Sequence, residues 1–408
     1  MSANKSDQIK HGVSLKFLLF FGFFLIGIVT VLIGQILPIL SARLSLSDDE
    51  AGYFFVAQFV GSLAGTLLAN SFVRRAGFSF VLLIGFALAA IGVFSLNSNS
   101  LPVCLGAFVL IGGGVGLTIP TINLLTIELN REKTSSALNV INFLWGCGAI
   151  LCKPFVDFFR VGNNIFTPTL VLASALLLVG FAIIFLPRQT KKKTEIIESS
   201  GKSFFPVWTT ATAWLIAAFN FLHIGLETGI GGWITTYAAR VEPQTINQNS
   251  IEWLSAASMF FLFLVAGRAF APLFLRFLSD NVLLLSGLLI MLAGIVLLLA
   301  VGDFRFLNVG AAIAGFGSSW IFPTNMSRFV KFFGETATRR ATPLFVAGSL
   351  GGAFTSYLIG FISARFNNLR LGMVVLLVSC VILIILQIIL SIKGGKNKIG
   401  RAADSHFY

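Results

Sequence analysis

The sequence predicts an all-α membrane protein whose twelve transmembrane helices form two pseudo-symmetric six-helix bundles. Of its 408 residues, 56% are hydrophobic and only 11% are charged, and the mean hydropathy is +0.91. A water-soluble globule needs more polar surface than this composition supplies. The apolar stretches are also long and unbroken, as in helices that cross a bilayer, and do not alternate as barrel strands do. Finally, the two halves of the chain repeat one another.

Twelve apolar stretches are long enough to cross a bilayer as helices. We expect the first six at 15–40, 50–73, 78–96, 101–128, 135–158 and 166–187, and the second six at 207–238, 251–276, 281–301, 305–329, 340–364 and 369–392. The first stretch is too long for a signal-peptide core and lacks a small-residue cleavage site after it. We therefore expect it to remain as the first span.

One long polar segment, from Pro187 to Pro206, separates the first six stretches from the second six. We expect an N-terminal bundle at 1–189, a cytoplasmic linker at 190–205, and a C-terminal bundle with a basic tail at 206–408. If the N-terminus is cytoplasmic, 21 of the 29 Lys and Arg residues lie in inner loops and tails and six in outer loops. This bias predicts that both termini are cytoplasmic.

The halves match each other at an offset of about 200 residues, which indicates a duplication. Four positions pair in chain order at offsets of 198 to 204: Gly27 with Gly225, Gly34 with Gly232, Pro120 with Pro323, and Gly148 with Gly352. Two repeated halves are typical of alternating-access carriers, whose substrate site lies between the halves near the middle of the membrane. We expect the same position for a site in this chain.

Several other classes of protein are disfavoured by the sequence. The four cysteines lie inside apolar stretches without metal-ligand spacing, and no phosphate-binding Gly-rich loop with Lys is present. We therefore expect no metal, no cofactor, no ATP-driven pump and no enzyme. The net charge of +13 is scattered over short loops, so nucleic acid is not an expected partner. Membrane lipid is an expected partner, and we expect the chain to act as a monomer.

The seventh span carries the most informative polar residues. Asn220, His223 and Glu227 are spaced i, i+3, i+7 and share one helix face. A carboxylate in a span needs a partner or a role. Glu227 can accept two hydrogen bonds from the hydroxyl groups of a substrate, and it is the leading candidate for proton coupling. The alternatives are a structural acceptor role for Glu227 and a packing role for His223.

The fifth span places a second polar face towards the centre. Asn139 and Asn142 share this face with Lys153 and Asp157. The two charged residues are four apart, so they either neutralise one another or act as a gate in which Lys153 meets the substrate or pairs with Glu227 in one conformation. Arg268, in the eighth span, is expected to snorkel or to form a salt bridge near the cytoplasmic side.

Amide and aromatic side chains on other spans suit a sugar, because hydroxyls need donors and acceptors while the ring faces stack on aromatic groups. Packing is the alternative role for any single Trp. The further candidates for substrate binding are Gln35, Gln58, Asn123, Trp145, Trp320, Thr324 and Asn325. Pro323 in the tenth span is expected to kink that helix as a gate.

The sequence resembles the major facilitator superfamily, and within it the fucose, galactose and glucose proton-symporter branch. The resemblance covers nearly the whole chain and is carried by the first two spans, by ALNVINFLWGCGAIL (137–151), by IGLETGIGGWITTY (224–237) and by GFGSSWIFPTNMS (315–327). It implies two six-helix bundles that carry a sugar together with a proton.

Two departures from the branch bear on how transport is driven. Asn70 and Val73 replace the Asp and Gly that normally precede two basic residues in the loop between the second and third spans. The acidic residues of the fucose transporter's first and fourth spans are also absent, with Gln35 and Ile119 near their places. Its proton-coupling pair therefore does not carry over.

We accordingly expect a secondary carrier of a neutral monosaccharide, a hexose, that works by alternating access in a bacterial inner membrane and is coupled to protons. Two alternatives remain open. One is a facilitative sugar uniporter, because the acidic pair is missing. The other is an exporter of drugs or amphiphiles, for which the 43 Phe residues would supply an adaptable apolar cavity.

Overall fold

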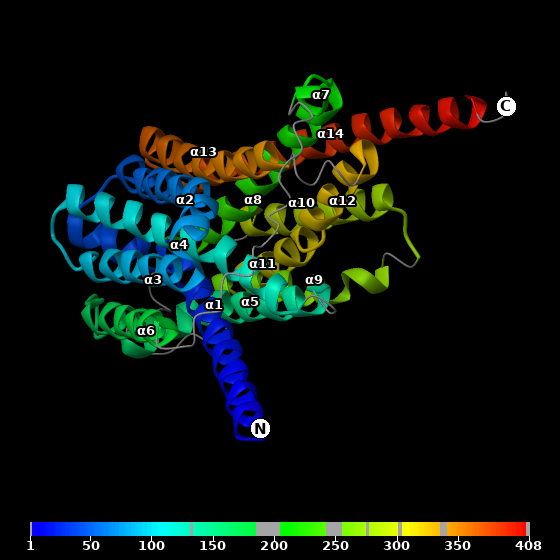
Figure 1. Ribbon diagram of the computed structural model, residues 1–408. Helices are drawn as coiled ribbons and strands as arrows, with labels where there is room; N and C mark the ends of the chain where they lie inside the picture. The colour runs from blue at the N-terminus through cyan, green and yellow to red at the C-terminus, as the bar shows by residue number, and fades with distance from the viewer. Residues whose placement is uncertain are drawn as a thin grey trace.

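The computed structural model describes residues 2–130, 134–184, 205–241, 255–274, 277–300, 304–334 and 341–404 (Figure 1). Within these ranges the chain is helical, with short turns and no named β-strand. Nearly all of the linker predicted at 190–205 lies outside the described residues.

The helices follow the predicted spans in order. The N-terminal bundle contains α1 (Ser2–Leu44), α2 (Asp48–Ala76), α3 (Phe78–Ser95), α4 (Leu101–Leu129), α5 (Thr134–Phe159) and α6 (Phe166–Ile184). A short α7 (Phe205–Trp208) precedes the C-terminal bundle, which contains α8 (Ala211–Val241), α9 (Ala256–Phe274), α10 (Asp280–Ala300), α11 (Phe304–Ser318), α12 (Ile321–Phe333), α13 (Thr342–Phe366) and α14 (Leu369–Asp404). In the described chain, eleven helical segments are long and apolar enough to span a membrane, with α11 and α12 forming one of them, and α9 supplies a shorter apolar helix.

The two bundles repeat the same helix packing, as the sequence duplication predicts. In the N-terminal bundle α1 packs on α5, α2 on α4, and α3 on both α4 and α6. The equivalent contacts in the C-terminal bundle join α8 to α13, α9 to α11, and α10 to both α11 and α14. Both paired glycines face the first long helix of their own bundle, since Gly148 packs on the α1 backbone at Phe24 and Gly352 packs on the Thr228 side chain of α8.

The tenth span breaks in two near Pro323, while α4 stays continuous through the equivalent Pro120. Helix α11 ends at Ser318 and α12 begins at Ile321. Proline has no N–H, so the carbonyl of the residue four positions earlier, Ser319, loses its usual helical partner. The expected kink is therefore present as a helix interruption one turn before the proline.

We name the two ends of the bundles end A, where α1 begins, and end B, where α1 finishes. Because successive helices run back and forth, α2 starts at end B, α8 and α13 finish there, and α9 starts there. Contacts between the bundles join α2 to α13, α1 to α8, and α5 to α9, and Figure 1 shows α13 beside α2 and α9 beside α5.

Between described residues, the inter-bundle hydrogen bonds lie in the end-B half, and the close glycine approaches lie there or at mid-depth. At the centre of this contact α1 crosses α8, where a Cβ added to Gly34 would be 2.3 Å from the carbonyl oxygen of Gly231 and 2.9 Å from the Cα of Gly232. Gly232 is the repeat partner of Gly34, so the duplicated glycines meet where the two halves meet. Nearer end B, Gly52 packs on Tyr357, and at mid-depth, on the end-A side of the crossing, Gly146 packs on Val265. The structure is therefore closed at end B.

We expect Gly34→Leu to prevent closure at end B, because the new side chain would collide with backbone atoms that cannot yield. A cysteine placed at Thr235, which is buried at the crossing, should then react with a maleimide about tenfold faster than in the parent, as expected for a shift of ~1.4 kcal/mol. The measurement requires replacement of the four native cysteines. Gly106→Leu is the control, because no heavy atom lies within 4 Å of a Cβ at Gly106. Equal labelling with Leu and Gly at position 34 would contradict this account of the crossing.

Candidate functional site between the two bundles

Polar side chains from both bundles lie just below the closed crossing, on its end-A side. Thr30 is one helical turn from Gly34 towards end A, and Glu227 is one turn from Gly231 in the same direction. One turn of α-helix spans about 5.4 Å, so Thr30 and Glu227 lie at the same depth on the two sides of the interface. This is the mid-membrane position at which duplicated carriers hold their substrates.

The N-terminal bundle contributes a linked cluster at this depth. The side-chain amide of Gln58 donates to the carbonyl oxygen of Thr30 (3.1 Å), and the indole Nε1 of Trp145 donates to the Thr30 hydroxyl (3.4 Å). The side-chain oxygen of Gln58 is buried and has no partner among the described residues. Buried polar atoms are normally paired, so this oxygen is an acceptor available to a ligand. Thr30 was not among the residues predicted from the sequence.

The C-terminal bundle contributes a charged pair. Nη2 of Arg268 on α9 lies 3.4 Å from Oε1 and 3.5 Å from Oε2 of Glu227 on α8. The Ser318 hydroxyl on α11 donates to Oε2 of Glu227 at 3.2 Å. The side chains of Glu227 and Arg268 are 16% and 35% exposed, so both reach open space and neither is sealed inside the bundle. A long, partly exposed ion pair can be opened by a competing ligand.

Arg268 is held by the break in the tenth span. Its Nε donates to the carbonyl oxygen of Ser319 at 3.4 Å, and this is the carbonyl that loses its helical partner because of Pro323. The proline thus frees an acceptor that orients the arginine towards Glu227. Sequence reasoning placed Arg268 near the cytoplasmic side, whereas the structure places it at the central pair. The sequence did contain a signal for this role, because a cation in an apolar span needs a charged partner or a function.

His223 lies behind Glu227 and does not face the interface. The imidazole is fully buried, and its Nε2 is 3.1 Å from the hydroxyl of Ser318. A sugar in the inter-bundle space would therefore meet Glu227 and Arg268 but not His223. The prediction that His223 binds substrate directly does not agree with this placement.

Helix α5 shows the polar face that its sequence predicts. Asn139 and Asn142 are exposed, and they lie towards end A from Gly146, which packs on α9. The amide of Asn142 donates to its own helix at Leu138 (2.8 Å), so its side-chain oxygen remains available. Both asparagines are therefore accessible on the end-A half of α5.

The two charged residues of α5 pair with one another, which is one of the two alternatives derived from the sequence. Lys153 forms an ion pair with Asp157, and Arg160 binds the same carboxylate at 2.8 Å. The side chain of Asp157 is 1% exposed. Arg268, and not Lys153, is the partner of Glu227 in this structure.

Three predicted substrate ligands instead hold the C-terminal bundle together. Trp320 is 2% exposed, and its Nε1 donates to the carbonyl of Leu283 on α10 at 2.8 Å. Asn220 donates to the carbonyl of Leu344 on α13 (2.8 Å), and Asn325 donates to the carbonyl of Ile216 on α8 (3.4 Å). Thr324 is buried on α12. These side chains share helices with the site but point into their own bundle, which helical periodicity alone did not distinguish.

The remaining two predicted amides differ in their positions. Gln35 sits at the closed interface, where its side-chain oxygen accepts from Thr235 on α8 at 2.9 Å. This bond joins the two bundles one residue beyond the glycine crossing, so in this state Gln35 belongs to the closure. Asn123 on α4 has a buried side-chain oxygen without a partner among the described residues.

An ion pair at end B fastens the bundles further. Arg240, at the end of α8, donates to both carboxylate oxygens of Asp48, at the start of α2, at 2.6 and 2.7 Å. The Ser363 hydroxyl on α13 donates to the same carboxylate. Asp48, an acid of the N-terminal bundle, is only 9% exposed. Two groups of the C-terminal bundle bind it. Sequence reasoning missed this lock, because nothing in the chain shows that the ends of α2 and α8 meet.

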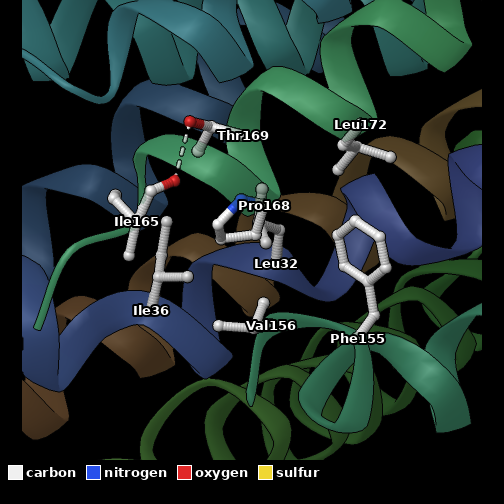
Figure 2. Close-up of a pocket in the computed structure, with 8 residues that line it drawn as sticks. All are labelled: Leu32, Ile36, Phe155, Val156, Ile165, Pro168, Thr169 and Leu172. Atoms are coloured by element: carbon white, nitrogen blue, oxygen red, sulfur yellow. Dashed lines mark hydrogen bonds between the residues drawn. The ribbon is translucent and has the colours of Figure 1, made fainter. Parts of the chain in front are cut away.

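A small pocket within the N-terminal bundle is not the site. Figure 2 shows that it is bounded by α1, α5 and α6 and lined by apolar side chains apart from Thr169. The hydroxyl of Thr169 donates to the carbonyl of Ile165 at 2.8 Å, so it is not free to bind a ligand. The pocket is a packing gap in which no lining side chain has a polar group free to bind a ligand.

Comparison with known families settles what kind of protein carries this site. The model of the Major Facilitator Superfamily matches residues 19–342, most of the chain. The chain belongs to this superfamily. It is therefore a multi-pass membrane transporter and not an enzyme, as the sequence predicted.

Individual members of the superfamily resemble the chain over most of its length. Glucose/mannose transporter GlcP of Bacillus subtilis is 23% identical over 375 residues, which cover 89% of this chain and 91% of the relative. Sodium-dependent glucose transporter 1 of Xenopus laevis is 23% identical over 361 residues, 81% of this chain and 72% of the relative. The crystal structure of the nucleoside transporter NupG has a TM-score of 0.75 at 14% identity and covers 92% of this chain and 98% of its own. At that identity NupG shows a common fold only.

Proposed function

We propose that this transporter carries a neutral monosaccharide, a hexose, by alternating access and that it is coupled to protons. The observation that carries the proposal is the two-sided polar site at mid-membrane depth, with Thr30, Gln58 and Trp145 on one bundle and Glu227 with Arg268 on the other. Together they offer amide, hydroxyl, carboxylate, guanidinium and indole groups, which match the hydroxyls and ring faces of a sugar. The likeness to a glucose/mannose transporter supports the same substrate class.

The closure at end B supports the proposed alternating access. The bundles meet there through the glycine crossing and the Asp48–Arg240 lock, while the asparagines of α5 are exposed towards end A. The bias of Lys and Arg supports a cytoplasmic end A. We therefore assign this structure to an inward-open state, with both termini cytoplasmic and the protein in the bacterial inner membrane as a monomer surrounded by lipid.

Proton coupling is assigned to Glu227. When Glu227 is ionised, Arg268 neutralises it, as in this structure. A proton on Glu227 would release Arg268 to bind a sugar hydroxyl, so that sugar and proton favour the same arrangement. The sodium dependence named for the Xenopus relative makes sodium the ion to compare directly with the proton.

Uptake into proteoliposomes tests the proposal. Labelled glucose, galactose or fucose is supplied under an inward proton gradient, an inward sodium gradient, or no gradient. We expect accumulation above the external concentration only with the proton gradient. Equilibration without accumulation in all three conditions would show a uniporter. Accumulation with the sodium gradient alone would show that sodium, and not the proton, is the coupling ion. No uptake of any hexose would refute the substrate class.

We expect Trp145→Phe to raise the KM for the sugar about fivefold, because the variant loses one hydrogen-bond donor worth about 1 kcal/mol. The ring remains to stack on the sugar, so kcat should change less than twofold. Initial rates of sugar exchange in proteoliposomes give both constants. Trp214→Phe is the control, since Trp214 is 59% exposed and donates to the carbonyl of Trp208 outside the site. An unchanged KM in Trp145→Phe would remove Trp145 from the sugar site.

A further inference from the structure

Behind the proposed coupling residue lies a hydrogen-bonded chain that the sugar site does not use. It runs from Glu227 through the Ser318 hydroxyl to His223, with distances of 3.2 and 3.1 Å. The imidazole is fully buried, and the chain links α8 to α11 through a single hydroxyl. A buried ionisable ring at mid-membrane depth calls for a physical reason.

The protons of this chain can be assigned from its donors and acceptors. Ser318 has one hydroxyl proton, and the carboxylate of Glu227, which can only accept, takes it. The oxygen of Ser318 is then the acceptor for His223, so the imidazole donates from Nε2. Its Nδ1 has a lone pair that meets no hydrogen-bond partner among the described residues. The three groups are thus aligned as a one-way series of donors ending on Glu227.

We infer that His223 and Ser318 are the proton relay of Glu227. Nδ1 of His223 is sealed in this state, so the proton enters when the transport cycle exposes Nδ1. Its uptake there allows the Nε2–H bond to break and that proton to form a new O–H bond on Ser318. The original Ser318 O–H bond breaks, and its proton forms the O–H bond of neutral Glu227. One proton enters, one carboxylate is neutralised, and the imidazole ends as the Nδ1–H tautomer.

This relay rests on the proposed proton coupling and adds a route to it. The charged groups that interact with the imidazole are Glu227 on its own helix and Arg268 on α9, while α11 contributes Ser318. Neutral Glu227 no longer pairs with Arg268, which is then available to a sugar. The relay and sugar binding are therefore linked through one ion pair.

The first test is His223→Gln. A glutamine amide nitrogen can replace Nε2 as the donor to Ser318, but an amide does not accept and pass on a proton. In proteoliposomes we expect sugar counterflow within about threefold of the parent, whereas proton-driven accumulation falls at least fivefold and uptake loses its dependence on pH. A purely structural role would lower protein yield and thermal stability without changing the ratio of accumulation to counterflow.

The second test is Ser318→Ala, which interrupts the same chain with a minimal change in volume. The expected result is the same loss of accumulation relative to counterflow. Ser286→Ala is the matched control, because Ser286 is a serine of the same bundle whose hydroxyl donates to its own helix at Leu283 (2.9 Å). The control should keep the parent ratio.

The outcomes separate this inference from the proposed function. If the parent accumulates sugar with protons and Glu227→Gln does not, while His223→Gln and Ser318→Ala both accumulate like the parent with its pH profile, the relay is wrong and the coupling role of Glu227 stands. If the parent does not respond to a proton gradient at all, both the coupling and the relay are overturned.

Discussion

Glu227→Gln is expected to abolish proton-driven accumulation while leaving sugar exchange measurable. Glutamine keeps the size and an acceptor oxygen but has no proton to bind and release, and it leaves Arg268 permanently without its partner acid. We expect the accumulation ratio to fall to about 1 and the KM for exchange to rise about fivefold, as for the loss of one hydrogen bond of ~1 kcal/mol. Uphill uptake and counterflow in the same proteoliposomes give the two values.

Asp280→Asn is the control for this variant. Asp280 is an acid at the end-A start of α10, paired with Lys331 at 2.5 Å and remote from the crossing. It should accumulate sugar as the parent does. Loss of both exchange and accumulation in Glu227→Gln would assign Glu227 to sugar binding alone, and unchanged accumulation would remove it from coupling.

Asp48→Asn is expected to unlock end B. The Asp48 carboxylate receives two bonds from Arg240 and one from Ser363, and the amide can neither pair with the guanidinium charge nor accept with both atoms. We expect the closed state to lose about 1–3 kcal/mol, which moves the equilibrium between the two states about 5- to 150-fold.

Spin-label distances measure this shift at both ends. In a protein without native cysteines, labels at the exposed positions Val161 and Phe366 report end B, and labels at Arg75 and Phe277 report end A. Asp48→Asn should lengthen the first distance and shorten the second. Arg240→Gln should do the same, because it breaks the same pair.

Asp49→Asn is the matched control for the lock, since Asp49 is the adjacent acid and the carboxylate that Arg240 binds is that of Asp48. Its distance distributions should match those of the parent. Distributions that stay unchanged in both Asp48→Asn and Arg240→Gln would show that the ion pair does not hold end B closed.

The architecture could be predicted from the sequence because it depends on patterns that a single chain displays. Hydropathy located the spans, and the offset between Gly34 and Gly232 indicated two equivalent halves. That these two glycines would touch each other was not predictable, because the duplication does not state which faces of α1 and α8 meet. The interruption of the tenth span followed from Pro323, since proline removes a helical donor.

The site was predicted less completely, because helical spacing gives a shared face but not the neighbour that covers it. The structure leaves Glu227 and Trp145 partly exposed near the α1–α8 crossing, whereas Trp320 is on a face that α10 covers. The partnership of Glu227 with Arg268 joins residues 41 positions apart, and no local pattern encodes it. A cation in an apolar span should have been matched with the nearest acid at the same depth.

Equilibrium binding of labelled glucose to the purified protein tests most directly whether the site lies between the bundles. We predict that Trp145→Ala on one bundle and Glu227→Ala on the other each weaken binding at least tenfold, because each removes a direct contact of about 1.4 kcal/mol or more. Trp320→Phe, which removes a hydrogen bond to α10 inside the C-terminal bundle and no group facing the other bundle, should bind like the parent. Glucose binding that survives both alanine variants, or that is lost in Trp320→Phe with the fold intact, would contradict the account.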